Sequence, residues 1–514
     1  MSLIRASATI GSLTLVSRIF GFVRDMMIAS LLGADILSDA FFVAFKIPNF
    51  MRRLFAEGAF NAAFLPLYAG TLAVDGQEKA KTLVEEIHAV LVTVLVALSI
   101  LAVIFMPVLM YVLAPGFDKD PEKYQLSVTL TRITFPYIFF ISLVSLQGGI
   151  LNSIDKFAAV AATPIIMNAC LIGSMLAVVR FVPTPAHALA IGVLVSGITQ
   201  YLWLHYFCRK TGVAPRMMWP RMTANVKKLF VLIGPAALGS SVAQINLMID
   251  VIIASLIPGA VSFLYYADRI SELPLGIIGI AVSTALLPML SRQIRSGNIA
   301  VALHTQNRAL ELSLLFGLPA TVALIVIPYP IIAVIYERGA FHATDTDATF
   351  KTLIAYAVGT PAFLMVKIFA STFYANQDTK TPVKIAIACV LINLFFNLTL
   401  MGPMKYVGLA LSTSIAGWVN AIALGVCLRK RHLFVVDTLF QFRISRILIG
   451  SALMGVALLL VYPLFEGYLH AGLVIKVITL SIFIATGGGV YALSLFFLKV
   501  LKISQLHEYF RKKL

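Results

Sequence analysis

The segment AFNAAFLPLY, residues 59–68, returns about 222 residues later as AVSTALLPML, residues 281–290. Two further pairs share nearly this offset, namely APGF (114–117) with RGAF (338–341), and the polar turns ILNSIDKF (150–157) and TFYANQDTKTP (372–382). Similarity at a fixed spacing indicates a structural unit that occurs twice in the chain. The sequence therefore predicts a fold built from two copies of one unit.

The composition is that of a membrane protein. Of the 514 residues, 60% are hydrophobic and 12% are charged, and the mean hydropathy is +0.94. A soluble chain of this length could not bury so much apolar surface. Apolar windows long enough to span a bilayer predict about fourteen helices, near residues 8–32, 39–68, 83–113, 127–151, 158–181, 186–208, 227–257, 262–290, 304–335, 350–374, 383–401, 406–428, 444–465 and 472–499. We expect an all-α polytopic membrane protein.

The repeat offset assigns helices 1–6 to one copy and helices 7–12 to the other. Because six is an even number, both copies have the same orientation, which places the pseudo-twofold axis along the membrane normal. The predicted parts are an N-terminal lobe (1–215), a C-terminal lobe (216–432) and two added helices with a basic tail (433–514). Facing repeats form a cleft that transporters commonly use for substrate.

The formal charge of +17 first suggests a nucleic-acid partner. The cations lie mostly in short connections on alternate sides of the apolar segments, however, which is typical of topology signals. By the positive-inside rule, both termini are cytoplasmic. We expect no nucleic-acid binding and no cleavable signal peptide. The four cysteines have no metal-ligand spacing, and we expect them to be reduced packing residues.

Charged residues also lie inside the first two predicted spans, where each costs about 2.5–3.5 kcal/mol on insertion scales. The cations are Arg18, Arg24, Lys46, Arg52 and Arg53, and the acids are Asp25, Asp39 and Glu57. Arg53 and Glu57 are four residues apart and can pair, whereas Lys46 has no evident role. One interpretation is salt bridges that hold helices together. The surplus of cations favours another, an anionic substrate in the cleft, since arginine binds phosphate and carboxylate in a bidentate manner.

The second repeat contains fewer polar residues within its spans. The predicted eighth helix contains Asp268, Arg269 and Glu272, and the seventh has a lone acid, Asp250. Together with Asn393, Asn397 and Thr413, Asp250 would supply oxygen ligands for a hard cation. Two other roles for Asp250 stay open, a protonatable coupling group and an acid bonded within helix packing.

Several motifs together resemble the MurJ (MviN) lipid II flippases of the multidrug/oligosaccharidyl-lipid/polysaccharide (MOP) exporter superfamily. They are VSRIFGFVRD (16–25), SDAFFVAFKIPNFMRRLFAEGAFNAAFLP (38–66), LAPGF (113–117), YYADRISELPLGIIGIAVSTALLP (265–288), ERGAF (337–341) and NQDTKTPVKIA (376–386). The resemblance implies a flippase of the bacterial inner membrane that works by alternating access. It implies that Arg18, Arg24, Arg52 and Arg269 bind the anionic headgroup, and that Ser17, Asp25, Asp39, Arg53 and Glu57 line or support the cavity, with Glu272 as a pairing partner.

The resemblance further implies coupling to membrane potential or to a Na⁺ or H⁺ gradient, with no cofactor. A sodium site would use Asp250, Asn393, Asn397 and Thr413. The expected partners are lipid II, membrane lipids and cell-wall synthesis proteins, and we expect a monomer. Helices 13 and 14 would form a groove for the polyprenyl tail.

Two alternatives remain open. The chain could export another polyprenyl-linked oligosaccharide or a drug on the same fold, although cationic drugs would favour acids in the cleft. A membrane-embedded polyprenyl-phosphate transferase would need a carboxylate cluster, for which ATDTDA (343–348) is the nearest candidate. We find no HExxH motif and no phosphate-binding GxxxxGK loop, and we therefore predict a transporter rather than an enzyme.

Overall fold

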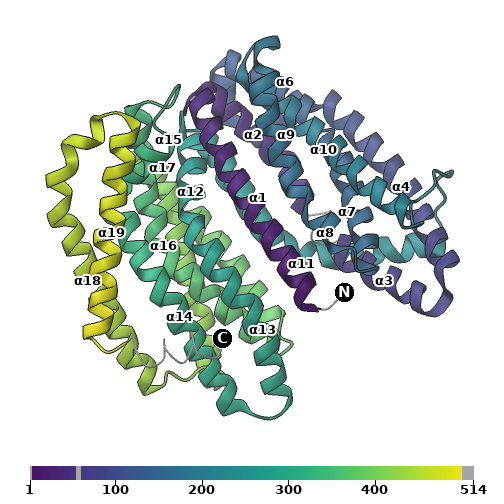
Figure 1. The fold of residues 1–514 in the computed structure, drawn as a ribbon. Helices are drawn as coiled ribbons and strands as arrows, with labels where there is room; N and C mark the ends of the chain where they lie inside the picture. Colours follow the sequence, from purple (N-terminus) through teal and green to yellow (C-terminus); the bar gives the residue numbers. More distant parts are fainter. Residues whose placement is uncertain (1–2, 54–59, 501–514) are drawn as a thin grey trace. The chain divides into compact units, whose positions relative to one another are not determined.

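The computed structural model describes residues 3–53 and 60–500. Every regular element in these ranges is helical, which confirms the predicted all-α class (Figure 1). The α-helices are α1 (Leu3–Leu32), α2 (Ile36–Met51), α3 (Phe60–Asp75), α4 (Gln77–Ile104), α5 (Met106–Leu113), α6 (Pro121–Thr134), α7 (Tyr137–Ser153), α8 (Phe157–Ala161), α9 (Thr163–Ala177), α10 (Pro185–Lys210), α11 (Ala224–Ser255), α12 (Ala260–Pro274), α13 (Ile280–Arg295), α14 (Ile299–Val326), α15 (Pro328–Tyr336), α16 (Ala343–Ala375), α17 (Lys380–Lys430), α18 (Thr438–Phe465) and α19 (Leu473–Phe497).

Ten helical stretches in the described part of the chain are long and apolar enough to cross a membrane. This supports a multi-pass membrane protein, and the count of fourteen stays a prediction. Prolines explain why several predicted spans are broken. Pro107 and Pro328 each lie in the first turn of a helix that follows a break, because proline fits a helix start but interrupts a helix interior. The range given as α17 covers two predicted spans, 383–401 and 406–428, and a kink with non-helical backbone at Lys405 separates them.

The internal repeat is visible in the helices themselves. Helix α14 begins and ends 222 residues after α4, and both have 28 residues. The quoted segments at 59–68 and 281–290 contribute to α3 and α13, each with an internal proline, Pro66 or Pro288. The predicted offset therefore holds at the level of secondary structure.

The chain divides into two compact units. The first comprises the residues up to Ser262 together with Arg338–Phe341, and the second comprises Phe263–Glu337 and the chain from His342 onward. Helix α11 belongs to the first unit because Val226 and Leu229 pack with α3 and α4 in one apolar core. The predicted boundary near residue 215 follows the sequence repeat instead, and it stays a prediction.

The core of the first unit is built around an aromatic stack along α3. Phe60, Phe64 and Tyr68 succeed one another at helical spacing, with ring centroids 5.2 and 5.6 Å apart. Ile87 of α4 and Ile150 of α7 are buried in the same cluster. These rings fill the space between three helices, which packs this part of the bundle closely.

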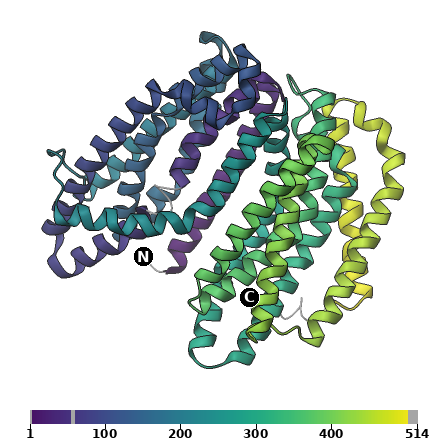
Figure 2. The same ribbon diagram turned by 180° about the vertical axis from the view of Figure 1, so that it is seen from behind.

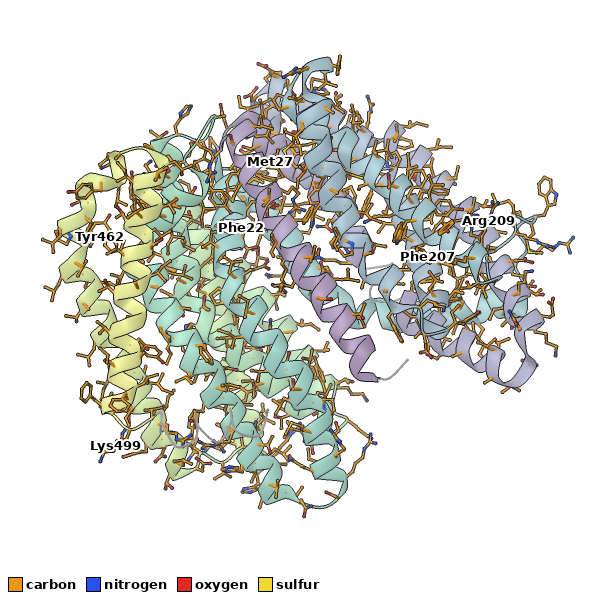
Figure 3. All side chains as sticks on the ribbon, viewed as in Figure 1. Phe22, Met27, Phe207, Arg209, Tyr462 and Lys499 are labelled. Carbon is orange, nitrogen blue, oxygen red and sulfur yellow. The ribbon has the colours of Figure 1, made fainter. Side chains whose placement is uncertain are left out.

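The second unit has two apolar cores. One joins α13, α14, α16 and α17 through residues such as Leu286, Leu310, Phe373 and Leu424. The other packs α18 and α19 against α14 and α15. Helices α18 and α19 lie side by side in both views, and Tyr462 marks α18 among the side chains (Figure 1, Figure 2, Figure 3). Their attachment to the unit is therefore mainly apolar.

Ion pairs hold the α18–α19 pair at two further points. Buried Lys476 of α19 donates to Glu337, just after α15, at 2.8 Å. Arg443 of α18 donates to Glu311 of α14 at 2.6 Å, and Arg308 contacts both Glu311 and Asp437. The two added helices are thus tied to the second unit by charge as well as by packing.

The turn NQDTKTP between α16 and α17 is organised by Asp378. Its carboxylate accepts hydrogen bonds from the Thr381 hydroxyl and backbone N–H and from Arg431. These bonds, first those from Thr381, hold the pKa of Asp378 well below its ordinary value. The polar side chains of Asp378, Thr381 and Arg431 are therefore bonded to one another within and beside this turn.

Glycines allow two close backbone contacts within the first unit. At one, Ala340 N–H donates to Ser30 O at 2.8 Å, and a Cβ on Gly339 would lie 2.3 Å from that oxygen. At the other, a Cβ on Gly116 would lie 2.2 Å from Ser255 O. The turn of each repeat thus contacts the end of the first helix of the other repeat, α1 or α11. The matching motifs are IASLLG (28–33) and IASLIPG (253–259).

We predict that Gly339→Ala destabilises the protein, because Gly339 has a left-handed backbone (φ +60°) as well as no room for a Cβ. The backbone conformation alone should lower the free energy of unfolding by about 1–2 kcal/mol. Thermal unfolding in detergent measures the effect. Gly70→Ala is the control, since it lies in α3 with nothing within 4 Å of its Cβ position. Equal melting temperatures for both variants would contradict the assignment.

Candidate functional site

The charged residues of α1 have very different surroundings. Arg24 and Asp25 are buried and pair with each other, with Arg24 Nη2 2.7 Å from Asp25 Oδ1. Arg24 Nη1 also donates to Asn168 Oδ1 of α9 at 2.8 Å, and Asn168 donates to Ser17 O. The guanidinium of Arg24 reaches the carboxylate of the adjacent Asp25 because its side chain is long enough to fold back on the helix.

Arg18 is exposed on the same helix, and among the described residues it has no hydrogen-bond or ion-pair partner. Its neighbours Leu15 and Ile19 are 61% and 56% exposed. A guanidinium amid exposed apolar side chains is expensive in a bilayer unless water or an anion compensates it. Arg18 is therefore available to bind an anion.

Asp39 of α2 is fully buried and has four donors around it. Lys123 Nζ of α6 lies 2.6 Å from Asp39 Oδ2, and the Gly259 N–H lies 3.1 Å from the same oxygen. The N–H and hydroxyl of Ser262 donate to Oδ1. Gly259 and Ser262 stand at the start of α12, where backbone N–H groups lack helical partners. Asp39 therefore caps α12 from another helix, and Lys123 balances its charge.

The remaining charges of the second predicted span lie where α2 ends. Arg52 Nε donates to Asn49 Oδ1 at 2.9 Å, and Arg52 and Arg53 are half-buried in a π-type turn. Lys46 is half-buried within α2, one turn before the end. Glu57 lies outside the described residues, and the Arg53–Glu57 pair stays a prediction. Pro48 inside α2 has no N–H to donate to Ala44 O, and that carbonyl accepts a hydrogen bond from the Thr134 hydroxyl at 2.9 Å.

In the second unit, Arg269 of α12 pairs with Glu272 three residues later. Arg269 Nη1 lies 3.3 Å from Glu272 Oε2, and the guanidinium carbon lies 4.9 Å from the centre of the Tyr265 ring. Asp268 is half-buried beside it. The side chain of Arg269 is 30% exposed, so it is only partly enclosed by these contacts. Glu272 thus pairs with an arginine of its own helix, Arg269.

The four residues predicted for a sodium ion divide between the units. Asp250 lies on α11 in the first unit, where Asn246 Nδ2 lies 3.3 Å from its carboxylate. Asn393, Asn397 and Thr413 lie on α17 in the second, the two asparagines buried and the Thr413 hydroxyl donating to Leu409 O. Within the described residues, no cluster of three or more His, Cys, Asp or Glu side chains could hold a metal ion. All four residues offer the oxygen ligands that suit a hard cation.

Sequence reasoning missed three residues that organise these charges. Asn168 bridges Arg24 and Ser17, Lys123 neutralises Asp39, and Ser262 donates to the Asp39 carboxylate. No local spacing links them to their partners, which lie 84 to 223 residues away along the chain. Lys367 of α16 makes another contact between distant segments, since its Nζ lies 3.3 Å from Leu275 O. Leu275 begins a π-helical turn just after Pro274, where the regular helical bonding is interrupted.

Comparison with known proteins assigns the chain to a family. The family model described as "Lipid II flippase MurJ" matches residues 28–480. The chain belongs to the MurJ family. A protein of Rhizobium tropici named "Probable lipid II flippase MurJ" is 39% identical over 519 residues, covering 100% of this chain and 97% of that protein. One of Burkholderia cenocepacia named "Lipid II flippase MurJ" is 35% identical, covering 84% and 85%.

Solved structures agree with membership of the MurJ family. The structure described as "Lipid II flippase MurJ, inward closed conformation" has a TM-score of 0.81 at 27% identity and covers 96% of this chain and 99% of its own. An inward-facing multidrug transporter of the MOP superfamily has a TM-score of 0.66 at 15% identity, covering 82% and 97%, which shows a shared fold alone. The predicted family and superfamily fold are confirmed, and so is a transporter rather than an enzyme.

Replacing Lys123 with Met should strongly destabilise this MurJ-family chain, because it leaves the buried Asp39 carboxylate without its cation. Loss of one partner of a buried pair costs about 3–5 kcal/mol. The double variant Asp39→Asn/Lys123→Met should regain much of the loss. Thermal unfolding in detergent is the measurement. The exposed pair Lys79–Asp75 supplies the control, where Lys79→Met should cost under about 1 kcal/mol. Equal effects of Lys123→Met and Lys79→Met would refute the role.

Proposed function

We propose that the chain is a lipid II flippase that carries the polyprenyl-diphosphate-linked precursor of peptidoglycan across the bacterial inner membrane. Family membership supports the substrate class, since the relatives are named for lipid II. The observation that carries the assignment is Arg18, exposed on an apolar helix without a partner in the described part of the chain. Such a cation favours an anionic headgroup and disfavours the export of cationic drugs.

The substrate's diphosphate and peptide carboxylates would be held by Arg18, Arg24, Arg52 and Arg269. Arginine suits this task because its planar guanidinium donates two parallel hydrogen bonds to such groups. Asp25 and Asn168 position Arg24, Asn49 positions Arg52, and Tyr265 with Glu272 positions Arg269. These contacts limit side-chain motion, which reduces the entropy that binding must overcome.

Transport would proceed by alternating access between the two predicted lobes. Within the first unit, the Asp39 contacts at the start of α12 and the glycine contacts at Ser30 and Ser255 join segments of the two repeats. A change of state would have to rearrange these contacts, and exposure of the Asp39–Lys123 pair to water would offset part of the cost.

Helices α18 and α19 would carry the polyprenyl tail. Their outward side chains are large and apolar, with Leu460 and Leu464 of α18 and Val474 of α19 each 71% exposed. Lys476 and Arg443 fix the pair to the second unit, so that the apolar surface has a defined position in that unit. We propose that the chain works as a monomer, among membrane lipids and in contact with cell-wall synthesis proteins.

The transferase alternative loses its main support. In ATDTDA, Asp345 accepts a hydrogen bond from His342 N–H at the start of α16, and Asp347 pairs with Lys351. Asp345 therefore caps the start of α16, and Asp347 forms an ion pair on the surface of the same helix. Export of another polyprenyl-linked oligosaccharide remains the alternative on the same fold.

We predict that Arg18→Ala, Arg24→Ala, Arg52→Ala and Arg269→Ala each abolish growth when the variant is the cell's only lipid II flippase. The physical reason is loss of a charge-assisted contact to the headgroup, worth about 1.5–3 kcal/mol for each hydrogen bond. Immunoblotting of membranes must show normal insertion. Arg295→Ala, at the exposed end of α13, is the control and should grow normally. Normal growth of cells that carry each of the four inserted variants would contradict the proposed role of these arginines in headgroup binding.

For coupling, we propose a sodium ion bound by Asp250, Asn393, Asn397 and Thr413. Sodium should raise the melting temperature of the wild-type protein relative to potassium or choline, because an ion that binds the folded state stabilises it. Asp250→Asn should abolish the difference by removing the only carboxylate of the set. Asp155→Asn, in the exposed turn after α7, should retain it. Sodium stabilisation of the Asp250→Asn protein would exclude Asp250 as a ligand, and proton coupling would then be the remaining ion-gradient route.

A further inference from the structure

The connection between α10 and α11 carries a dense positive charge that the proposed transport does not use. From Arg209 to Lys228 the chain has six cations and no acid, namely Arg209, Lys210, Arg216, Arg221, Lys227 and Lys228. Arg209 stands at the end of α10 (Figure 3). Charge of this kind is a topology signal in many membrane proteins. The conformation of residues 211–223, which we call the inter-repeat linker, indicates a further role.

The inter-repeat linker is held at two points, both on α4. The backbone N–H of Arg216 lies 3.4 Å from Glu85 Oε1, and the Thr223 hydroxyl donates to Glu86 Oε2 at 2.7 Å. Pro215 and Pro220 prevent helix formation between α10 and α11. The part of the linker from Arg216 to Thr223 is therefore a non-helical segment that contacts α4 at both ends, and the residues between these contacts are exposed.

Those middle residues combine large apolar side chains with free guanidinium groups. All seven residues from Arg216 to Met222 are exposed, with Trp219 at 85%, Met217 at 71% and Met222 at 58%. Neither the Arg216 nor the Arg221 guanidinium has a hydrogen-bond or ion-pair partner among the described residues. Exposed apolar patches of this kind mark an interaction site. A partner that is both apolar and anionic would therefore complement this segment.

We propose that the inter-repeat linker binds the anionic phospholipid headgroups of the inner leaflet, with Trp219 and the methionines inserted at the interface. Tryptophan prefers the level of the headgroups, and arginine forms bidentate contacts with phosphate. The linker joins the ends of two apolar helices, so it lies next to the bilayer surface. Phe230 and Val231 in the first turns of α11, 40% and 72% exposed, continue the apolar surface toward the hydrocarbon layer. This location favours lipid over an acidic protein surface.

The fluorescence of Trp219 tests the proposal directly. The chain has three tryptophans, and Trp203→Phe/Trp418→Phe leaves Trp219 as the only one. The full-length protein is placed in nanodiscs of phosphatidylcholine alone or mixed with phosphatidylglycerol. We expect a blue-shifted emission in the mixed bilayers, severalfold stronger quenching by brominated phosphatidylglycerol than by brominated phosphatidylcholine, and a return toward aqueous emission at high salt.

Variants separate the charge effect from a general effect on the protein. Arg216→Gln/Arg221→Gln should remove the preference for brominated phosphatidylglycerol. Arg292→Gln/Arg295→Gln, which removes two arginines near the end of α13, should retain it. Emission typical of water in both bilayers, or equal quenching by the two lipids, would overturn the proposal. So would burial of Trp219 that needs an added acidic protein. Arg18→Ala should leave the Trp219 signal intact, so failure of lipid II transport and failure of lipid binding are distinguishable.

Discussion

A charge within a bilayer has no water to solvate it, and this constraint governs how the chain is built. Each buried charge must have an opposite charge, a set of hydrogen-bond donors, or an anion supplied from outside. Asp39 has the first two, in Lys123 and the start of α12. Arg24, a cation, has an opposite charge in Asp25 and a hydrogen-bond acceptor in Asn168 Oδ1. Arg18 has neither among the described residues, and the proposed substrate would supply the missing anion.

The same constraint explains the backbone. Helices satisfy their own peptide groups, so an apolar environment permits little else, and the irregular segments lie between helices. Two of these segments make the glycine contacts with the ends of α1 and α11. The contacts are related by the internal repeat, and one extra methyl group would disturb either of them. Each contact joins a turn of one repeat to the end of the first helix of the other repeat.

Local pattern was enough to predict much of this fold. Apolar windows placed the helices, and the pair AFNAAFLPLY and AVSTALLPML indicated an offset that α4 and α14 reproduce at both ends. Helix breaks were less predictable, because Pro107 and Pro328 begin new helices inside windows that read as continuous. A hydropathy window averages over many residues, so it does not detect a break at a single proline. Within α17 the gap between the two apolar windows coincides with a kink, where Lys405 has a non-helical backbone, so this division was visible in the sequence.

The charged residues proposed for the site could be listed from the sequence, whereas their pairings could not. The positions of Arg18, Arg52 and Arg269 in apolar segments were visible in the sequence. The partners of Arg24 and Asp39 were not, because Asn168 and Lys123 reach them from helices far away along the chain. Spacing rules describe neighbours on one helix, and contacts across helices depend on the fold.

We propose that Arg18, which has no hydrogen-bond or ion-pair partner among the described residues, binds the headgroup of lipid II. Native mass spectrometry of the purified protein with lipid II, compared between the wild type and Arg18→Gln, tests this claim. The claim predicts about tenfold weaker binding for the variant, as expected from loss of a hydrogen bond to a charged group. It also predicts weaker binding of an undecaprenyl monophosphate than of the diphosphate by the wild type alone. Equal affinity of the two proteins for lipid II would contradict the claim.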